Sequence, residues 1–271
     1  MSVSAPQSLP EYGNPPVDEV VCGVLFEPIK GFLLPHFGLL WEKFRKEYPR
    51  CEEVAPLMPV VEGPEQVPAQ EIVVSEMLLP RVWFLRDDGR IIQVQRDRFL
   101  HNWRKLNPTD EYPRYRVVFQ MFQDHFSTFQ NFLSENEFGL LIPRQYEMTY
   151  VNIIHEGAGW QTIEEVSKVF PDFSWGIRKD RFLPNPFAVH WRTTFSLPNN
   201  AGRLHLDIQS ARRVSDNRRV FRFEITARGI GAAPSLDTMK NWFDLAHEWI
   251  VWGFTDFTGA EIQRTIWGRK V

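Results

Sequence analysis

The stretch at residues 81–104 constrains the fold more than any other part of this chain. It contains the turn sequence Asp-Asp-Gly, ending at Gly89, between two β-prone runs at residues 81–86 and 91–96. An Asp-Gly pair in this setting predicts a β-hairpin, because glycine supplies the positive φ that the turn needs. The chain therefore contains at least one antiparallel pair of strands.

The residues after the hairpin crowd polar and aromatic groups together. We predict a short helix that Asp97 caps, with Arg98 and Asn102 four residues apart on one side. Phe99 and Trp103 form the adjacent apolar side and should dock on the core. Arg98 and Asn102 then either bind the backbone of the following loops or line a pocket beside Trp103.

The other elements follow from apolar periodicity and from turn residues. Strands are predicted at residues 17–26, 71–77, 145–155, 187–197, 203–213 and 220–228. Helices are predicted at residues 35–48, 114–136, 162–170 and 235–257, and an exposed, proline-rich loop at residues 51–70.

This order predicts an α+β protein in which the second half repeats the first. Residues 1–16 form a flexible lead-in, and each half, at residues 17–143 and 144–271, reads strand, helix, strands, long helix. The two halves are expected to form one continuous domain. Its architecture is one curved antiparallel sheet with the helices on one face.

Composition narrows the class of protein without identifying an activity. The 271 residues carry a net charge of −3, which gives no overall attraction to polyanions. Cys22 and Cys51 lie in no metal-spaced pattern and are read as reduced thiols. The N-terminus lacks the features of a signal peptide, and no apolar run is long enough to span a bilayer. We therefore expect a cytoplasmic protein without a membrane partner.

Several segments together resemble a known family. They are PPVDEVV near the start, RVWF followed by GRIIQVQRDRFLHNWRK, then YPRY and YEMTYVN. These segments resemble a sporadically distributed bacterial family of uncharacterised proteins of about 250–270 residues, and the resemblance runs from Pro15 to Gly268. Its most specific part is QVQRDRFxxNWRK. The resemblance implies no activity, cofactor or catalytic residue, but a patchy distribution is typical of mobile or defence genes, including toxin–antitoxin cargo.

Strand alternation separates a polar face of the sheet from the face that meets the helices. Together with the segment after the hairpin, this face supplies the candidate binding residues Gln93, Gln95, Arg98, Asn102, Trp103, Arg104, His190, Arg192, His205, Asp207, Arg222 and Glu224. Antiparallel sheets normally leave one face in water, so a solvated face is the alternative interpretation. Asp207 and Arg222 are then a cross-strand ion pair.

Motifs for catalysis or for metal binding are weak. His205 and Asp207, with His190 opposite, have the chemistry of a metal site but not a diagnostic spacing, so we predict neither a metal nor a cofactor. Asp244, His247 and Glu248 lie at i, i+3 and i+4, a pattern suited to metal binding or acid–base chemistry. We favour a salt-bridge set on the helix surface. No nucleophile elbow or phosphate-binding loop is present, so we predict no catalytic residues.

The last helix is apolar on two sides. Its core stripe comprises Leu236, Met239, Phe243, Ala246, Ile250 and Phe254, and its second stripe comprises Trp242, Leu245, Trp249 and Trp252. Both stripes must be covered. Either the tail at residues 260–271 folds back over the second stripe, or Trp242, Trp249 and Trp252 form an interface with a protein partner or in a homodimer.

These observations favour a non-enzymatic recognition protein that binds a macromolecular partner, within a mobile or defence system. A second interpretation is an enzyme or small-ligand binder that uses the polar face or the pocket near Asn102. A third is a nucleic-acid binder, because the second half carries a basic run at Arg212, Arg213, Arg218 and Arg219.

Overall fold

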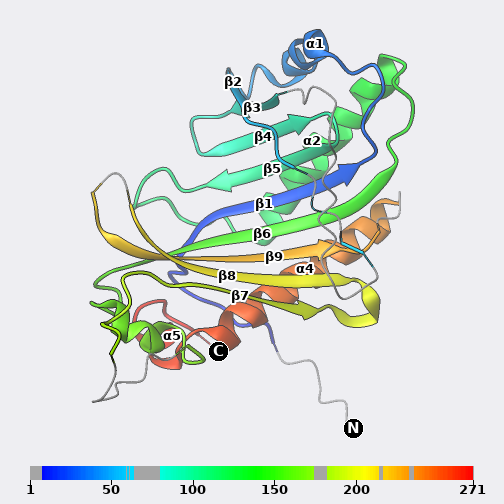
Figure 1. Ribbon diagram of the computed structural model, residues 1–271. Coiled ribbons are helices and arrows are strands. Elements are labelled where there is room, and N and C mark those ends of the chain that lie inside the picture. The colour runs from blue at the N-terminus through cyan, green and yellow to red at the C-terminus, as the bar shows by residue number, and fades with distance from the viewer. Residues whose placement is uncertain are drawn as a thin grey trace.

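The strands of this protein form one antiparallel sheet in the order β2-β3-β4-β5-β1-β6-β9-β8-β7 (Figure 1). The computed structural model describes residues 8–58, 60, 62–63, 80–173, 182–213, 216–231 and 235–270. Its strands are β1 (Val17–Phe26), β2 (Arg50–Val54), β3 (Arg81–Leu85), β4 (Arg90–Gln95), β5 (Arg98–Arg104), β6 (Pro143–His155), β7 (His190–Ser196), β8 (Gly202–Arg212) and β9 (Arg219–Gly229). Its helices are α1 (Leu34–Phe44), α2 (Tyr115–Glu135), α3 (Val166–Val169), α4 (Leu236–Phe257) and α5 (Ala260–Thr265), with 3-10 turns η1 (Ile163–Glu165) and η2 (Pro198–Asn200).

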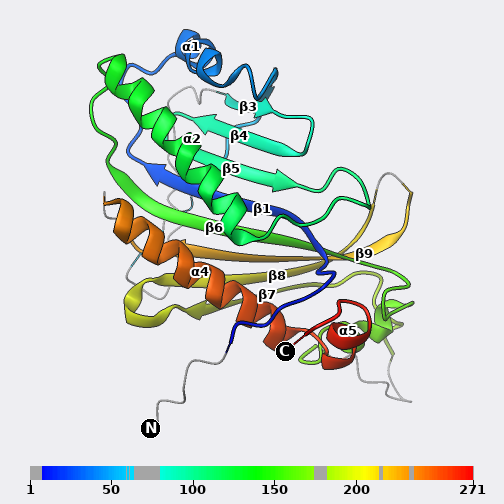
Figure 2. The ribbon, with the colours of Figure 1, turned by 180° about the vertical axis from the view of Figure 1, so that it is seen from behind.

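The two long helices, α2 and α4, lie on the same face of the curved sheet (Figure 2). Alternate residues of β1, such as Val20, Cys22 and Val24, are fully buried on this face. The apolar stripe of α2 packs against them through phenylalanines, and Phe99 of β5 stacks on Phe129 with ring centroids 5.0 Å apart. The predicted α+β class, with one curved antiparallel sheet, is confirmed.

β1 and β6 lie side by side at the middle of the sheet and pair along most of their length. Outward from β1 come β5, β4, β3 and β2, and outward from β6 come β9, β8 and β7. The sheet is therefore continuous between the two halves of the chain. This order agrees with the expected repeat, while superposition of the two halves stays a prediction.

The predicted hairpin is present as β3 and β4, with Gly89 at φ 84° in its turn. The helix predicted after it is wrong, because β5 pairs with both β4 and β1. Two ladders of backbone hydrogen bonds outweigh a local capping signal. The Asp97 carboxylate accepts hydrogen bonds from Arg98 and from Gln95 instead of capping a helix.

Other boundaries differ because tertiary pairing decides them. β2 lies within the predicted loop at residues 51–70, since it pairs with β3 as an edge strand. The strand predicted at residues 71–77 lies outside the described residues. α1 ends earlier than expected, and the helix predicted at residues 162–170 is a 3-10 turn followed by a single α-helical turn.

The expected flexible lead-in is ordered from residue 8 onward. Tyr12 is buried, and its hydroxyl lies 2.8 Å from Oγ1 of Thr255 on α4. Gly13 donates a backbone hydrogen bond to Gly268, so the two ends of the chain pair with each other. The C-terminal tail folds back, but its Trp267 packs on Phe254, in the core stripe of α4, rather than over the second stripe as one of the two alternatives expected.

Candidate functional site

The predicted polar face exists and lies opposite α2 and α4. The pairing of β4, β5, β1, β6, β9, β8 and β7 places every candidate binding residue except Trp103 on it. Trp103 is buried on the helix face and contacts the ring of Tyr112. A pocket shared by Arg98, Asn102 and Trp103 is therefore excluded, because neighbours in a strand point to opposite faces.

Much of this face is covered by the protein itself. Four described residues, Leu57, Met58, Val60 and Glu62, cross it and are called the strap. Oε1 of Gln95 accepts a hydrogen bond from the Leu57 N–H at 2.8 Å, and its Nε2 donates to the Leu57 carbonyl at 3.0 Å. A freely solvated face, as in the alternative interpretation, is therefore wrong for the residues under the strap.

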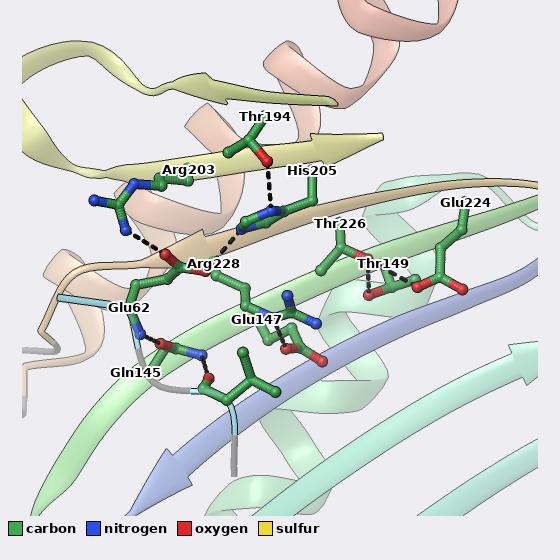
Figure 3. A network of polar contacts seen from close by, with 11 residues as sticks. Glu62, Gln145, Glu147, Thr149, Thr194, Arg203, His205, Glu224, Thr226 and Arg228 are labelled. Carbon is green, nitrogen blue, oxygen red and sulfur yellow. Dashed lines mark hydrogen bonds and ion pairs between the residues drawn. The ribbon is translucent and has the colours of Figure 1, made fainter. Parts of the chain in front are cut away.

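The other end of the strap is held by β6 and β8 (Figure 3). Gln145 accepts from the Glu62 N–H at 2.8 Å and donates to the Val60 carbonyl at 2.9 Å. The Glu62 carboxylate forms an ion pair with Arg203 and lies 2.7 Å from Nε2 of His205. Burial alone raises the pKa of Glu62, but the hydrogen bonds from these two side chains outweigh it and lower the pKa to about 2.

A second network of buried polar side chains lies on the part of this face that β1, β3, β4 and β5 form. Gln93 accepts from Arg81 at 2.7 Å and from the Trp83 indole at 3.0 Å, and it donates to Asn102 at 2.7 Å. Asn102 in turn donates to Glu19 at 2.5 Å. Burial raises the pKa of Glu19. Asn102 thus holds the Glu19 carboxyl in place, and within the network Nε of Arg81 is a buried atom without a hydrogen-bond partner.

The candidate binding residues of the second half do not converge on one site, because they bind different partners. Asp207 binds Arg192 and His190, the latter at 3.1 Å, whereas His205 turns to Glu62 and to Thr194. No group of three or more His, Cys, Asp or Glu side chains in the described part of the chain is arranged to hold a metal ion.

The expected pair between Asp207 and Arg222 is wrong. Arg222 binds Glu224 on its own strand, since the register places Asp207 opposite Glu224. Arg104 lies over the ring of Trp83, with its guanidinium carbon 5.5 Å from the ring centroid. Arg228 on β9 forms a cross-strand ion pair with Glu147 on β6, at 2.6 Å (Figure 3).

The basic run of the second half is partly neutralised, by two carboxylates for four arginines. Arg213 and Arg218 both pair with Asp216, and Arg219 pairs with Glu156. Arg212 donates to the carbonyl of Asn217. Three of these four arginines already form ion pairs with carboxylates, so the run makes a weak phosphate-binding surface. No contact of this run favours nucleic-acid binding.

The tryptophans predicted at an interface have three different environments. Trp242 is 9% exposed, packs on Tyr146 and donates from its indole to the Ala201 carbonyl at 2.9 Å, so it belongs to the core. Trp249 is half-buried against the core. Trp252 is half-buried and lines a cavity. Leu236, placed in the core stripe by the sequence, is exposed.

A concave site lies beside Trp252. It has a volume of about 750 Å³ and lies between the N-terminal segment, the start of α2, the middle of α4 and the helix face of β6 and β9. The groups that give it chemistry are Tyr112, Arg114, Tyr115, Tyr150, Asp244 and His247.

A chain of hydrogen bonds runs along its wall. The hydroxyls of Tyr112 and Tyr150 lie 2.6 Å apart, and the Tyr150 hydroxyl lies 3.2 Å from Nδ1 of His247. The ring of Tyr115 stacks on His247 with centroids 4.2 Å apart, and its hydroxyl donates to Asp244 at 2.8 Å. The predicted salt-bridge set is therefore only partly right: Asp244 binds Lys240 at the surface, but His247 faces tyrosines.

Electrostatics keep this wall neutral. Burial lowers the pKa of His247 to about 4 and raises the pKa of Tyr112 and of Tyr150. At neutral pH the imidazole is uncharged and the phenols are protonated. The chain can run in either direction, so Nε2 of His247 presents either a donor or an acceptor.

Arg114 adds a strained backbone at the edge of the cavity. Its φ of 71° and ψ of 154° are rare for a residue other than glycine. The guanidinium donates to the Tyr12 carbonyl at 3.1 Å and lies over the ring of Tyr112. Strain of this kind gathers at binding sites, where the surrounding contacts hold it in place. In the sequence, the spacing of Asp244 and His247 was the one signal for this site, because the tyrosines come from two distant segments, residues 112–115 and β6.

No helix among the described residues combines the length and the hydrophobicity of a bilayer span. Comparison of the chain with family models, with curated proteins and with solved structures gives no match.

Proposed function

We propose that this protein binds a small, uncharged polar molecule in the cavity between α2, α4 and the N-terminal segment. The observation that carries the proposal is the hydrogen-bonded chain Tyr112–Tyr150–His247 on the wall of a cavity of about 750 Å³. Ligand sites of small molecules are typically about 300–1,000 Å³, mostly apolar, with a few convergent polar groups.

The chemistry of the wall sets the class of ligand. A charged group placed against neutral Tyr150 and His247 would lose its hydration. The charged lining residues Arg114 and Asp244 are already engaged, the first with the Tyr12 carbonyl and the second with Lys240. A hydroxyl, carbonyl or ring nitrogen gains a hydrogen bond there, and the aromatic rings favour a flat molecule. Binding, rather than a particular reaction, is the function that this arrangement supports.

The test is ligand-observed NMR with a panel of neutral phenols, carboxamides and heteroaromatic alcohols. We expect at least one probe to bind the full-length protein. Tyr150→Phe removes the hydroxyl that joins Tyr112 to His247 and should weaken that probe about tenfold, which corresponds to a loss of about 1.4 kcal/mol. Because the pKa of His247 is about 4, affinity should not change between pH 5 and pH 8.

Two tryptophan substitutions on α4, one at the cavity and one away from it, provide a matched test and control. Glu248 lines the cavity and is exposed, so Glu248→Trp should fill the entrance and abolish binding without unfolding the chain. Asn241 is exposed on α4 but does not line the cavity, so Asn241→Trp should bind as the natural chain does. Equal binding by the two variants, or no binding by any probe, would contradict the proposal.

A further inference from the structure

The strap lies on the opposite face of the sheet from the cavity, and polar contacts alone hold its backbone. Gln95, Arg98, Leu25 and Gln145 form one cross-strand row over β4, β5, β1 and β6. The two glutamines at the ends of this row are three strand spacings apart, about 14 Å. The five steps from Leu57 to Glu62 reach at most about 17 Å, so a segment of this length is long enough to span the row.

The glutamines bind backbone rather than side chains. Each uses its amide oxygen for an N–H and its amide nitrogen for a carbonyl of the strap. Such contacts do not depend on the sequence of the bound segment. The one side chain that is selected is the carboxylate of Glu62, which Arg203 and His205 bind (Figure 3).

Two apolar side chains of the strap, Met58 and Val60, contribute little to its attachment, whereas Leu57 is half-buried. Met58 is 50% exposed and Val60 is 43% exposed. Their burial therefore adds little free energy, and each hydrogen bond of the strap contributes only about 0.5–1.5 kcal/mol net. A segment held in this way can be exchanged for another that makes the same contacts.

The groups that hold the strap are enclosed when it is in place. Gln145 is fully buried and Arg203 is 8% exposed. Without a bound segment the Gln145 amide would turn to water, and an occupant that restores its two hydrogen bonds gains about 0.5–1.5 kcal/mol net for each. An occupant must supply an extended backbone along the row and an acid at the position of Glu62.

From these contacts we propose that the polar face is a peptide-binding groove for an extended acidic segment of a partner protein, and that the strap occupies it in cis. The partner segment adopts the path of the strap: the two glutamines hold its backbone, and Arg203 and His205 bind its Glu or Asp. Because the strap is joined to β2 by two residues, its effective concentration at the groove is on the order of mM or higher, so the partner competes against it.

The probe is a fluorescein-labelled synthetic peptide with the sequence of residues 55–63, APLMPVVEG, and the readout is fluorescence anisotropy with the full chain. Glu62→Ala weakens the strap and should bind the peptide at least tenfold more tightly than the natural chain. Glu53→Ala removes an exposed acid outside the strap and should bind as the natural chain does. Adding Arg203→Ala to Glu62→Ala, or replacing the peptide glutamate by glutamine, should remove the gain.

A folded Glu62→Ala variant that binds no tighter than Glu53→Ala, or that binds a scrambled peptide equally, overturns the proposal. If Glu62→Ala does not fold, hydrogen exchange of the natural chain decides instead. Excess peptide should then accelerate exchange at the amides of Leu57 and Glu62 several-fold and leave the other strands unchanged. If excess peptide leaves the exchange rates of these two amides unchanged, the strap is a permanent part of the fold. That result also overturns the proposal.

Discussion

Asn102 illustrates how single residues of the sheet serve structure rather than an open site. It is buried, accepts a hydrogen bond from Gln93 and donates one to Glu19. Burial raises the pKa of Glu19, so this carboxyl already lies in an unfavourable environment for charge. The role of Asn102 is therefore to satisfy two buried groups at once.

Asn102→Ala should lower the stability of the protein. It removes the Asn102 partner of the Gln93 amide nitrogen and of the Glu19 carboxyl, at a cost of about 1–3 kcal/mol for each group. Urea denaturation followed by circular dichroism measures the loss. Asn131 is exposed on α2, and Asn131→Ala should change stability by less than about 0.5 kcal/mol. An Asn102→Ala variant as stable as this control would show that the residue is reserved for a ligand.

At the scale of elements, α4 uses residues from both of its apolar sides within one chain, although Trp249 and Trp252 stay half-buried. Its first stripe faces β6 and β9, where Phe243 and Ile250 are buried. Its second stripe begins with Trp242, which the Ala201 carbonyl and Tyr146 cover, and continues to Trp252 at the cavity. An amphipathic surface helix needs one apolar stripe, and the second one here is used for internal packing and for a cavity wall.

Trp242→Ala should destabilise the fold by about 3–5 kcal/mol, the usual cost of removing a buried aromatic side chain. Chemical denaturation gives the stability, and light scattering gives the association state. Asn241→Ala, one residue away and exposed, should alter neither. A Trp242→Ala variant that keeps its stability but loses self-association would instead place this tryptophan at an interface.

At the scale of the whole molecule, the pair β1–β6 unites the two halves of the chain. β1 comes from the first half and β6 from the second, and they pair from Val17 with Asn152 to Phe26 with Pro143. The termini add a second connection, because residues 11–14 bond to residues 267–270. Neither half has a complete sheet without the other.

Separate fragments, residues 1–139 and 140–271, should therefore not fold alone but should fold when mixed. Each fragment by itself exposes the edge and the apolar face of a central strand, which favours aggregation. Far-UV circular dichroism and urea titration of the fragments and of their mixture measure this. The control is the intact chain with a protease site at the exposed Leu140, cleaved after folding, which should stay assembled. Cooperative unfolding of either fragment alone would contradict the expectation.

The sequence by itself determined the elements whose signals are local and repeated. The hairpin around Gly89, the strand Val17–Phe26 and the helices α2 and α4 follow from turn chemistry and from apolar periodicity, and the polar face follows from strand alternation. These features depend on neighbours within a few residues, which a sequence contains directly.

Only the tertiary structure decided what lies across the sheet. β5 is a strand because two distant strands pair with it, β2 is a strand because it meets β3, and the strap covers a face that alternation alone leaves in water. The cavity likewise joins Tyr112, Tyr150 and His247 from three separate segments. Such contacts depend on strand register and on chain crossings, and neither is encoded in the local pattern of residues.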